Sequence, residues 1–555
     1  MKTDVLFVTN PLSLISYVHQ KDLYTGYRYM ASVLRSRGFG AEILYPELPR
    51  EFPETVYFCD DARIASRRLR TELLNCISEQ IAGVDCRVLG FSPNISNFRF
   101  IIALVRKLRS SGCDSHVVLG GHLATFSHKR LLSHYDCIDS IVRGEGEYTI
   151  VELTERIKRG ETLEGVLGLS YRNGNATTVN PPRPLVPDLN DLPLPATDRL
   201  DELAHDPEGR SYWMRICCSR GCYGNCSFCS VRAFYHLCPG KKWRARSPRK
   251  VVDELEMLKR DFGMDSFVLG GDNFWCGTEK QRVAYTNEVA QEIIRRKLDV
   301  RLKINCRSND VHENNLKQMK RAGLTDVEIG VESVSQRALD TFRKGTSVRQ
   351  NEAALRLLKK LGLRVYIDFI FYDPYLNLNE VRQNFEFQRR YWAENVGFPL
   401  FTKLILAEGF PITETLRQEG LLEGRFPLYE FRFADPIVGS LESVHTKTWI
   451  KGHHILSTLP PLMAASFYGV ALSDERSREL KPFLSALKNR FEFLKLHYFD
   501  RMLQAIESTK ARNADSVERL LAREVAPWND EIDETRNSLR SIYLHLRECV
   551  PAGEE

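Results

Sequence analysis

The stretch Ser219-Arg220-Gly221-Cys222-Tyr223-Gly224-Asn225-Cys226-Ser227-Phe228-Cys229 decides how this chain is interpreted. Its three cysteines have the spacing CxxxCxxC and follow a predicted strand, Tyr212–Cys217. Three thiolates on one short loop can bind one face of a [4Fe–4S] cluster, which needs four ligands, so one iron stays open. An open position on a metal lets it bind a substrate or cofactor. A glycine-rich, hydrophilic loop is a poor setting for three unrelated core cysteines.

Strands and helices alternate on both sides of this loop. Between about 211 and 420 the pattern predicts six β/α units, which favour a partial (β/α)6 TIM-type barrel over the full eight. The predicted strands of this region are Tyr212–Cys217, Ser266–Leu269, Arg301–Asn305, Asp326–Val331, Arg364–Phe371 and Leu400–Leu406. The fold class expected is therefore α/β.

The first 180 residues form a separate α/β unit in this interpretation. Short apolar runs at residues 5–8, 41–44, 87–90, 116–119 and 140–142 alternate with helical stretches, which predicts a doubly wound, Rossmann-like parallel sheet. Gly38, Gly112 and Gly160 are placed to end helices, and Asn173-Gly174 predicts a hairpin.

Four segments follow from these patterns. We expect a Rossmann-like domain over 1–180, a Pro-rich linker over 181–205, a barrel over 206–428 and a mainly helical C-terminal domain over 429–555. The linker holds prolines 181, 182, 184, 187, 193 and 195, which favour an extended, stiff chain. Residues 476–508 and 530–547 are the long helices expected in the last segment.

Composition narrows the class of protein. The chain has 555 residues, 43% of them hydrophobic and 27% charged, and a net charge of +6, so nucleic acid is not an expected partner. Fourteen cysteines are too sparse for a disulfide scaffold, and the start shows no signal-peptide layout, so we expect a cytoplasmic protein. The uncharged stretch 455–473 contains Pro460-Pro461, which favours a buried helix over a membrane span.

The cysteine loop resembles that of the radical S-adenosylmethionine (SAM) superfamily. The resemblance implies that Cys222, Cys226 and Cys229 hold a [4Fe–4S] cluster whose open iron binds SAM, and that reductive cleavage of SAM gives a 5′-deoxyadenosyl radical. It also implies SAM contacts for Phe228 and for residues at the ends of the second, third and fourth barrel strands, namely Gly270, Gly271, Asp272, Arg307 and Glu332. Asp272 stands where the family often has a glutamate.

The first domain resembles the cobalamin-binding domain that precedes many radical SAM enzymes. The phrases that carry the resemblance are Gly90-Phe91-Ser92-Pro93, Leu119-Gly120-Gly121-His122 and Arg143-Gly144-Glu145-Gly146-Glu147. They imply cobalamin contacts at Ser92, Gly120, Gly121, His122, Gly144 and Glu145. The motif DxHxxG, which supplies a histidine to cobalt, is absent, because Asp114-Ser115-His116 lacks the glycine and enters a strand. A degenerate domain without corrin stays open, as does a capping or surface role for His122.

These resemblances imply a cobalamin-dependent radical SAM enzyme that methylates an unactivated carbon of a small molecule. An external electron donor such as flavodoxin or ferredoxin is implied as well. A rearrangement, cyclisation or ring contraction with the same cofactors is the alternative, and a purely structural iron–sulfur or zinc module is a third interpretation. A methylthiotransferase is disfavoured because the N-terminal cysteines are scattered. We interpret the basic run Lys241–Arg246, with Arg249 and Lys250, as a solvated surface that leads into a helix.

Overall fold

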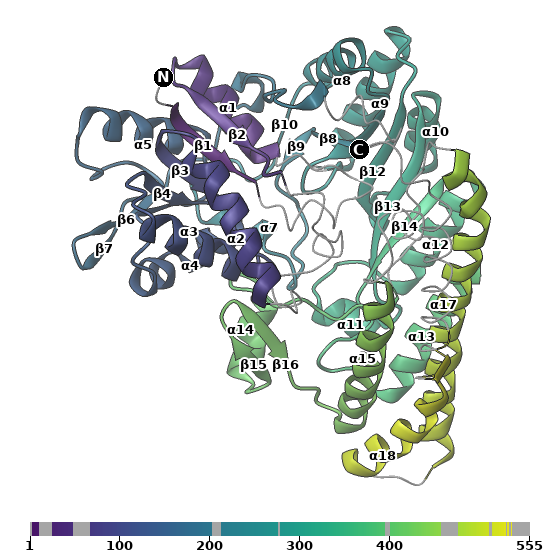
Figure 1. Cartoon of the computed structure of the whole chain (residues 1–555). Coiled ribbons are helices and arrows are strands. Elements are labelled where there is room, and N and C mark those ends of the chain that lie inside the picture. The colour runs from purple at the N-terminus through teal and green to yellow at the C-terminus, as the bar shows by residue number, and fades with distance from the viewer. Residues whose placement is uncertain are drawn as a thin grey trace.

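The computed structural model describes residues 3–9, 25–47, 67–201, 213–275, 278–393, 400–456, 475–509 and 513–528, together with 530, 531 and 534. Figure 1 shows two sheets side by side, one near the N-terminus and one in the middle of the chain, with long helices beyond the second. The predicted α/β class is confirmed, as is the order of the units along the chain.

The N-terminal sheet has the strand order β2-β1-β3-β4-β5-β6-β7. Its first five strands are parallel and β6 and β7 are antiparallel, as the hairpin at Asn173-Gly174 predicted. The elements are β1 Thr3–Val8, α1 Thr25–Ser36, β2 Ala41–Leu44, α2 Arg67–Ala82, β3 Cys86–Phe91, α3 Phe98–Ser110, β4 His116–Leu119, α4 Gly121–His134, β5 Ser140–Val142, α5 Glu147–Arg159, β6 Leu169–Asn173 and β7 Ala176–Val179.

Both faces of this sheet are buried, which is why its strands are continuous apolar runs. Phe7 and Val88 face one core, and Leu6 and Leu89 face the other. The first core continues into the barrel, where it includes Ile216. In a sheet of order 2-1-3-4-5, ligands bind beyond the carboxyl ends of the strands where the order reverses. That edge points toward the barrel.

The central sheet is a five-stranded parallel barrel segment of order β14-β13-β12-β11-β8. Its elements are β8 Met214–Cys217, β9 Ser219–Arg220, α7 Val231–His236, β10 Arg244–Ala245, α8 Pro248–Phe262, β11 Ser266–Gly270, α9 Glu279–Arg295, β12 Arg301–Arg307, α10 Glu313–Arg321, β13 Leu324–Glu332, α11 Gln336–Thr341, α12 Val348–Lys360, β14 Arg364–Phe369 and α13 Leu378–Ala393. The helix ends follow local chemistry, as when Ser247 accepts a hydrogen bond from the Lys250 amide ahead of Pro248 and Gly263 ends α8 in the left-handed region.

The predicted sixth strand, Leu400–Leu406, is wrong. Only two isolated bridges form there, a parallel one between Tyr372 and Lys403 and an antiparallel one between Leu406 and Tyr429. Phe401 has a φ of 57°, which a continuous strand does not accommodate. The partial barrel is thus closed on this side by irregular chain.

The remaining elements are α14 Pro411–Gln418, β15 Leu422–Arg425, β16 Leu428–Phe431, α15 Pro436–Leu456, α17 Glu475–Ser508 and α18 Ala514–Glu524. Helices α15 and α17 pack against α13, so they cover the outer side of the barrel (Figure 1). The long helix predicted over 476–508 is confirmed as α17, whereas nearly all of 455–473 and most of 530–547 lie outside the described residues. None of the helices in the described parts of the chain is both long and apolar enough to cross a membrane.

The linker holds one short 3-10 turn, Leu189–Asp191, among its described residues, and Leu185 and Val186 are buried against the two domains. The exact domain boundaries stay a prediction.

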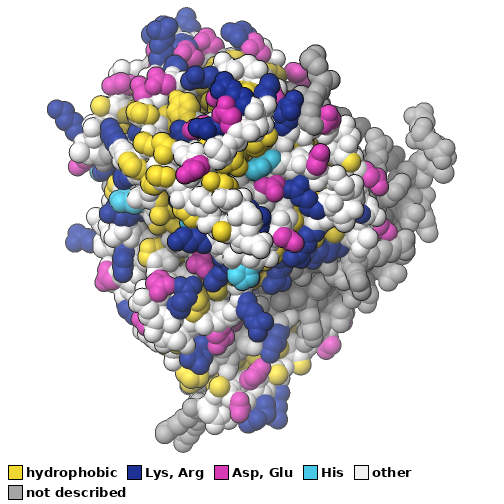
Figure 2. All heavy atoms as spheres, turned by 90° about the vertical axis from the view of Figure 1, so that its left-hand side faces the viewer, with side chains coloured by type: hydrophobic (Ala, Val, Ile, Leu, Met, Phe, Trp, Pro, Cys, Tyr) yellow, Lys and Arg dark blue, Asp and Glu magenta, His cyan; other side chains and the backbone are white. Residues whose placement is uncertain are grey.

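Figure 2 shows Lys and Arg interspersed with Asp and Glu on the face that the N-terminal domain presents.

Candidate active site

The cysteine loop lies between β9 and α7 at the carboxyl end of the barrel, and its glycines are required by close contacts. Gly221 has a φ of 88°, and a Cβ there would overlap the carbonyl oxygen of Lys242. A Cβ on Gly224 would lie 2.6 Å from Nη1 of Arg307. A side chain at Gly221 would therefore displace the loop that carries the cysteines, and one at Gly224 would displace the guanidinium of Arg307.

The loop is also fixed by hydrogen bonds to the barrel. The Ser227 amide donates to the carbonyl of Phe342 at 2.8 Å, and its hydroxyl donates to the carbonyl of Thr341 at 2.9 Å. The Tyr223 hydroxyl donates to Oδ1 of Asp310 at 2.6 Å. The cysteines are thus held by a loop that one backbone and two side-chain hydrogen bonds attach to the barrel.

The three thiols fit a cluster that binds thiolates. Arg307 Nη1 lies 3.1 Å from Sγ of Cys226, and the Gly224 amide lies 3.3 Å from Sγ of Cys222, so both donate toward sulfur. Burial, together with the nearby Cys226 and Cys222, raises the pKa of Cys229 to about 12. Among the described residues, no three His, Cys, Asp or Glu side chains converge on one ion position. A cubane cluster does not require that, since its cysteines bind separate irons.

The second-strand residues Gly270, Gly271 and Asp272 lie directly beside the loop. A Cβ on Gly271 would overlap the carbonyl oxygen of Ser219. Oδ2 of Asp272 accepts a hydrogen bond from the Gly221 amide at 2.7 Å. Asp272 therefore fixes the cysteine loop with one oxygen, a role that the sequence did not indicate, and the assignment to SAM stays a prediction for the other.

Arg307 and Glu332 end the third and fourth strands on the same side of the barrel. Arg307 also donates to the carbonyl of Lys344 and lies 5.3 Å from the ring centre of Tyr223. Glu332 accepts from Lys344 Nζ at 2.8 Å and has a φ of 66°, a conformation that costs energy in a residue other than glycine. Phe228 packs edge-on against Phe342, at 5.4 Å between ring centres. The structure thus gathers the predicted SAM residues around the loop.

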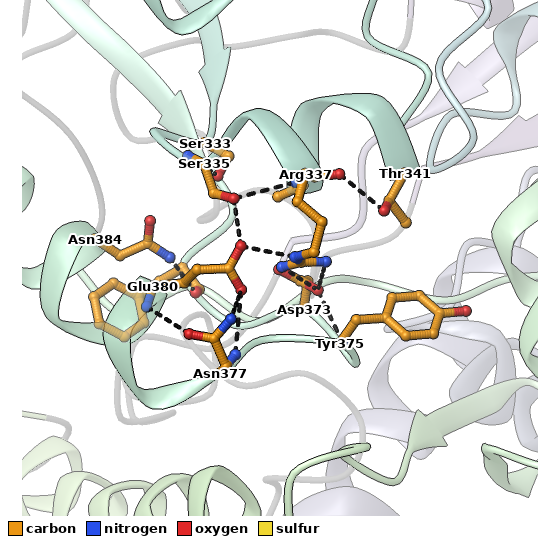
Figure 3. A network of polar contacts seen from close by, with 11 residues as sticks. Ser333, Ser335, Arg337, Thr341, Asp373, Tyr375, Asn377, Glu380 and Asn384 are labelled. Carbon is orange, nitrogen blue, oxygen red and sulfur yellow. Dashed lines mark hydrogen bonds and ion pairs between the residues drawn. The ribbon is translucent and has the colours of Figure 1, made fainter.

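A polar network supports the turns that follow Glu332 (Figure 3). Arg337 donates to Oδ2 of Asp373 at 3.0 Å and to Oε1 of Glu380 at 2.7 Å. The Ser335 hydroxyl also donates to Glu380. Because Asp373 and Glu380 come from the segments after β14, this network joins the loops of the fourth and fifth strands.

A cavity of ≈ 320 Å³ separates the N-terminal sheet from the barrel. From the first domain it is lined by the carboxyl ends of β1, β3, β4 and β5, and from the barrel by residues of β8, β9 and the turn after β11. Ser92, Gly120, Gly121, Gly144 and Glu145, all predicted to contact cobalamin, line it, and so do Gly271 and Asp272. One hollow therefore reaches both sets of predicted residues.

The cavity walls suit a broad ligand. A Cβ on Gly121 would lie 2.6 Å from the Ser92 hydroxyl, and one on Gly146 would lie 2.9 Å from Met30 Sδ. A Cβ on Gly120, by contrast, meets nothing closer than 3.9 Å. Because glycines have no side chain, they do not narrow the cavity. We conclude that these residues fit a planar group such as a corrin.

His122 is the exception among the predicted cobalamin contacts, because it is absent from the cavity lining. Its Nδ1 lies 2.6 Å from the Ser230 hydroxyl, and its ring stacks on Phe234 with 4.0 Å between ring centres. Burial lowers its pKa. His122 therefore joins α4 to the helix that follows the cysteine loop. His116 begins β4, at the strand end opposite the cavity.

For part of the basic run Lys241–Arg246, the interpretation as a solvated surface is wrong. Arg244 and Arg246 are 3% and 4% exposed, not solvated. Arg244 pairs with Glu145 at 2.8 Å, and Arg246 pairs with Glu254. Both arginines are buried because a carboxylate from another element neutralises each of them. The predicted helix at Ser247-Pro248 is confirmed as α8.

Sequence reasoning missed several residues of the site. Arg220 and Glu147 face each other across the two domains, and Lys344 contacts Glu332. Asp368 lies on β14 between Ile367 and Phe369, which face the helices, so its exposed side chain faces the barrel interior. Alternation of apolar residues along β14 could have identified Asp368, whereas the partners of Arg220 are distant in the sequence.

Comparisons with known families agree with this geometry. Residues 216–387 match the family model of the Radical SAM superfamily, and residues 25–154 match that of the B12 binding domain. The chain belongs to the radical SAM superfamily, in the group whose members carry a B12-binding domain before the radical SAM domain. Its cofactors are a [4Fe–4S] cluster, SAM and cobalamin. The resemblances identified in the sequence are therefore confirmed.

Several relatives are enzymes of varied chemistry. An uncharacterized methyltransferase of Pyrococcus horikoshii is 30% identical over 59% of this chain and 69% of its own length. The anaerobic magnesium-protoporphyrin IX monomethyl ester cyclase of Cereibacter sphaeroides is 33% identical over 46% of this chain and 41% of its own length. The hopanoid C-3 methylase of Methylococcus capsulatus is 29% identical over 60% of both chains.

Two solved structures share the fold. The cobalamin-dependent SAM radical enzyme OxsB, with aqua-cobalamin and SAM bound, matches with a TM-score of 0.69 and 17% identity over 98% of this chain and 79% of its own. The radical SAM methyltransferase TsrM of Kitasatospora setae, with tryptophan and a SAM analogue bound, matches with a TM-score of 0.58 and 19% identity over 77% of this chain and 80% of its own. At these identities the likeness shows the fold alone.

Proposed function

We propose that this protein is a cobalamin-dependent radical SAM methyltransferase that methylates an unactivated carbon of a small molecule. The observation that carries the proposal is the single cavity that runs from the strand ends of the B12-binding domain to Gly271-Asp272 beside the cysteine loop. Methyltransferases among the relatives support it. When bound, the cofactors supply an electron for SAM cleavage and a methyl group for transfer.

The chain's own residues position the reacting groups. The cysteine loop fixes the cluster position through Gly221, Asp272 and Arg307, and the turn after β13 presents Glu332 on the same side. Holding reactants in one geometry lowers the entropic part of the reaction barrier. Helices α15 and α17 cover the barrel on the side away from the cavity.

The barrel interior supports a polar rather than a hydrocarbon substrate. Lys303 pairs with Glu328 at 2.7 Å on the inner face of the sheet, and Asp368 is exposed there. Among the described residues, no side chain donates a hydrogen bond to Asp368. A carboxyl group in that position suits a substrate that brings a hydroxyl, amine or amide group. We further propose an external electron donor such as flavodoxin or ferredoxin, and a cytoplasmic location.

The proposal is tested on protein prepared anaerobically with hydroxocobalamin. We expect about four irons and one cobalt per chain, and reduced protein given SAM with a deuterated methyl group should release 5′-deoxyadenosine and label the bound cobalamin. Cys226→Ala should reduce 5′-deoxyadenosine formation to background, because only two cysteines would hold the cluster. Cys113→Ser, at a partly exposed cysteine in the N-terminal domain, is the matched control.

Two results would contradict the proposal. Iron without cobalt would leave the radical chemistry and exclude cobalamin as the methyl carrier. Bound cobalamin that never acquires the label would favour the alternative, a rearrangement or cyclisation without net methyl transfer. Among the relatives, the magnesium-protoporphyrin IX monomethyl ester cyclase is named for such a reaction.

A further inference from the structure

An ion-pair network forms the wall between the cavity and the cysteine loop. Arg220 stands two residues before Cys222, and its guanidinium donates to Oε1 of Glu145 at 3.0 Å and to Oε1 of Glu147 at 2.5 Å. Arg244, which pairs with Arg220 in the β9–β10 ladder, donates to Oε2 of Glu145 at 2.8 Å. The side chains of all four residues are at most 12% exposed.

The network leaves one carboxylate oxygen without a partner. Both oxygens of Glu145 accept hydrogen bonds, and Oε2 of Glu145 also accepts from the Val186 amide at 2.7 Å. Oε2 of Glu147 is buried and accepts no hydrogen bond. Glu147 is only 4% exposed, and it lines the cavity. An unpaired buried acceptor is costly, so the site is suited to a ligand that supplies a donor.

Glu147 thus has one oxygen on Arg220 and a second, enclosed oxygen without a donor at the cavity wall. The side chain of Arg220 continues into the backbone of the cysteine loop, where Gly221 is anchored by Asp272. A donor that holds Glu147 also restrains Arg220, and Arg220 restrains the residues before Cys222. The path from the cavity to the first predicted cluster ligand consists of two side chains.

We propose that the cavity's occupant donates a hydrogen bond to Glu147 Oε2 and thereby stabilises the cysteine loop through Arg220, so that cobalamin binding and cluster retention are coupled. The inference rests on cobalamin as the occupant, whose amide side chains are donors of the required kind. Coupling between two sites is reciprocal, so the loaded cluster strengthens cobalamin binding by the same factor.

The test measures iron release from the reconstituted full chain to an Fe²⁺ chelator, with and without saturating hydroxocobalamin. In the unmodified protein we expect hydroxocobalamin to slow iron release by about fivefold or more, the lower end of measured couplings. In Glu147→Gln the protection should fall below about twofold. The amide nitrogen would take the place of the free oxygen, and it cannot accept a hydrogen bond from the occupant. Glu152→Gln is the matched control, because Glu152 lies on the same helix, pairs with Arg183 and does not line the cavity.

A second variant tests the path. In an Arg220→Lys background, which keeps the charge but loses the forked geometry, Glu147→Gln should cause no further loss of protection. Equal protection in Glu147→Gln and in the unmodified protein overturns the inference, as does an undiminished effect of Glu147→Gln in the Arg220→Lys background. If the unmodified protein does not bind hydroxocobalamin, the proposed function fails instead, and cobalt content distinguishes the two failures.

Discussion

The contact between the barrel and the N-terminal domain is hollow and charged, whereas the contact between the barrel and the C-terminal helices is filled and aromatic. On the first side, glycines and the Arg220–Glu147 pair surround a cavity. On the second side, Phe401 packs at 4.6 Å from Phe499 and at 4.4 Å from His445 between ring centres. The first contact has the composition of a ligand site, and the second has that of a protein core.

This difference predicts that variants at the two contacts of the barrel will lose different properties. Changes on the aromatic side should lower stability and leave cofactor binding by the folded protein intact. Changes on the hollow side should lower cofactor binding and leave stability nearly unchanged.

The largest effect is expected at the aromatic contact. Phe499 is fully buried on α17 among Phe371, Phe385 and Phe401, so Phe499→Ala should lower the free energy of unfolding by about 3 to 5 kcal/mol. Urea denaturation measures this. Phe493→Ala, on the same helix but 54% exposed, should change it by less than about 0.5 kcal/mol. Loss of cobalamin binding by folded Phe499→Ala would contradict the separate roles of the two contacts.

Gly120→Thr tests the hollow contact. A side chain at residue 120 enters free space in the cavity wall, and Thr keeps the helix-capping preference of Gly. Overpacking costs about 1 to 3 kcal/mol, so we expect hydroxocobalamin affinity to fall by about 10- to 100-fold. Absorbance titration measures the affinity. Iron content in the absence of cobalamin and the urea midpoint should stay unchanged, and an unchanged affinity would show that the cavity is not the cobalamin site.

The pH dependence of stability tests whether His445 is enclosed in the aromatic contact. Burial among Phe401, Phe499 and Tyr372, together with the nearby Lys495, lowers the pKa of His445 to about 3. The unfolded chain takes up a proton near pH 6.5, whereas the folded chain does not, so stability falls as the pH drops below that value. His445 should contribute a loss of about 2 kcal/mol between pH 7 and pH 5.

His445→Gln removes the titrating group at that position. The variant should lose correspondingly less stability over the same interval, as measured by urea denaturation at each pH. An identical pH profile for the variant and the unmodified protein would show that His445 is already solvated in the folded state.

The cysteine loop and the strands near it were identified from local patterns. Cys222, Cys226 and Cys229 lie within eight residues, so their proximity follows from chain connectivity alone. The buried parallel strands were predicted for a similar reason, because each is a short apolar run bounded by turn residues. The predicted strand Leu400–Leu406 failed because its residues adopt irregular backbone at Phe401, which no local pattern indicated.

Local sequence patterns were enough to identify two α/β units, a loop with three thiols and glycine-rich strand ends. Which of these groups lie together depends on how the domains pack. Arg220 pairs with Glu147, and Arg244 pairs with Glu145, only because the two domains pack together. Likewise, His122 turns toward Ser230 rather than the cavity because α7 occupies its surroundings. Ligand-binding residues contributed by separate elements depend on packing, which a local pattern does not encode.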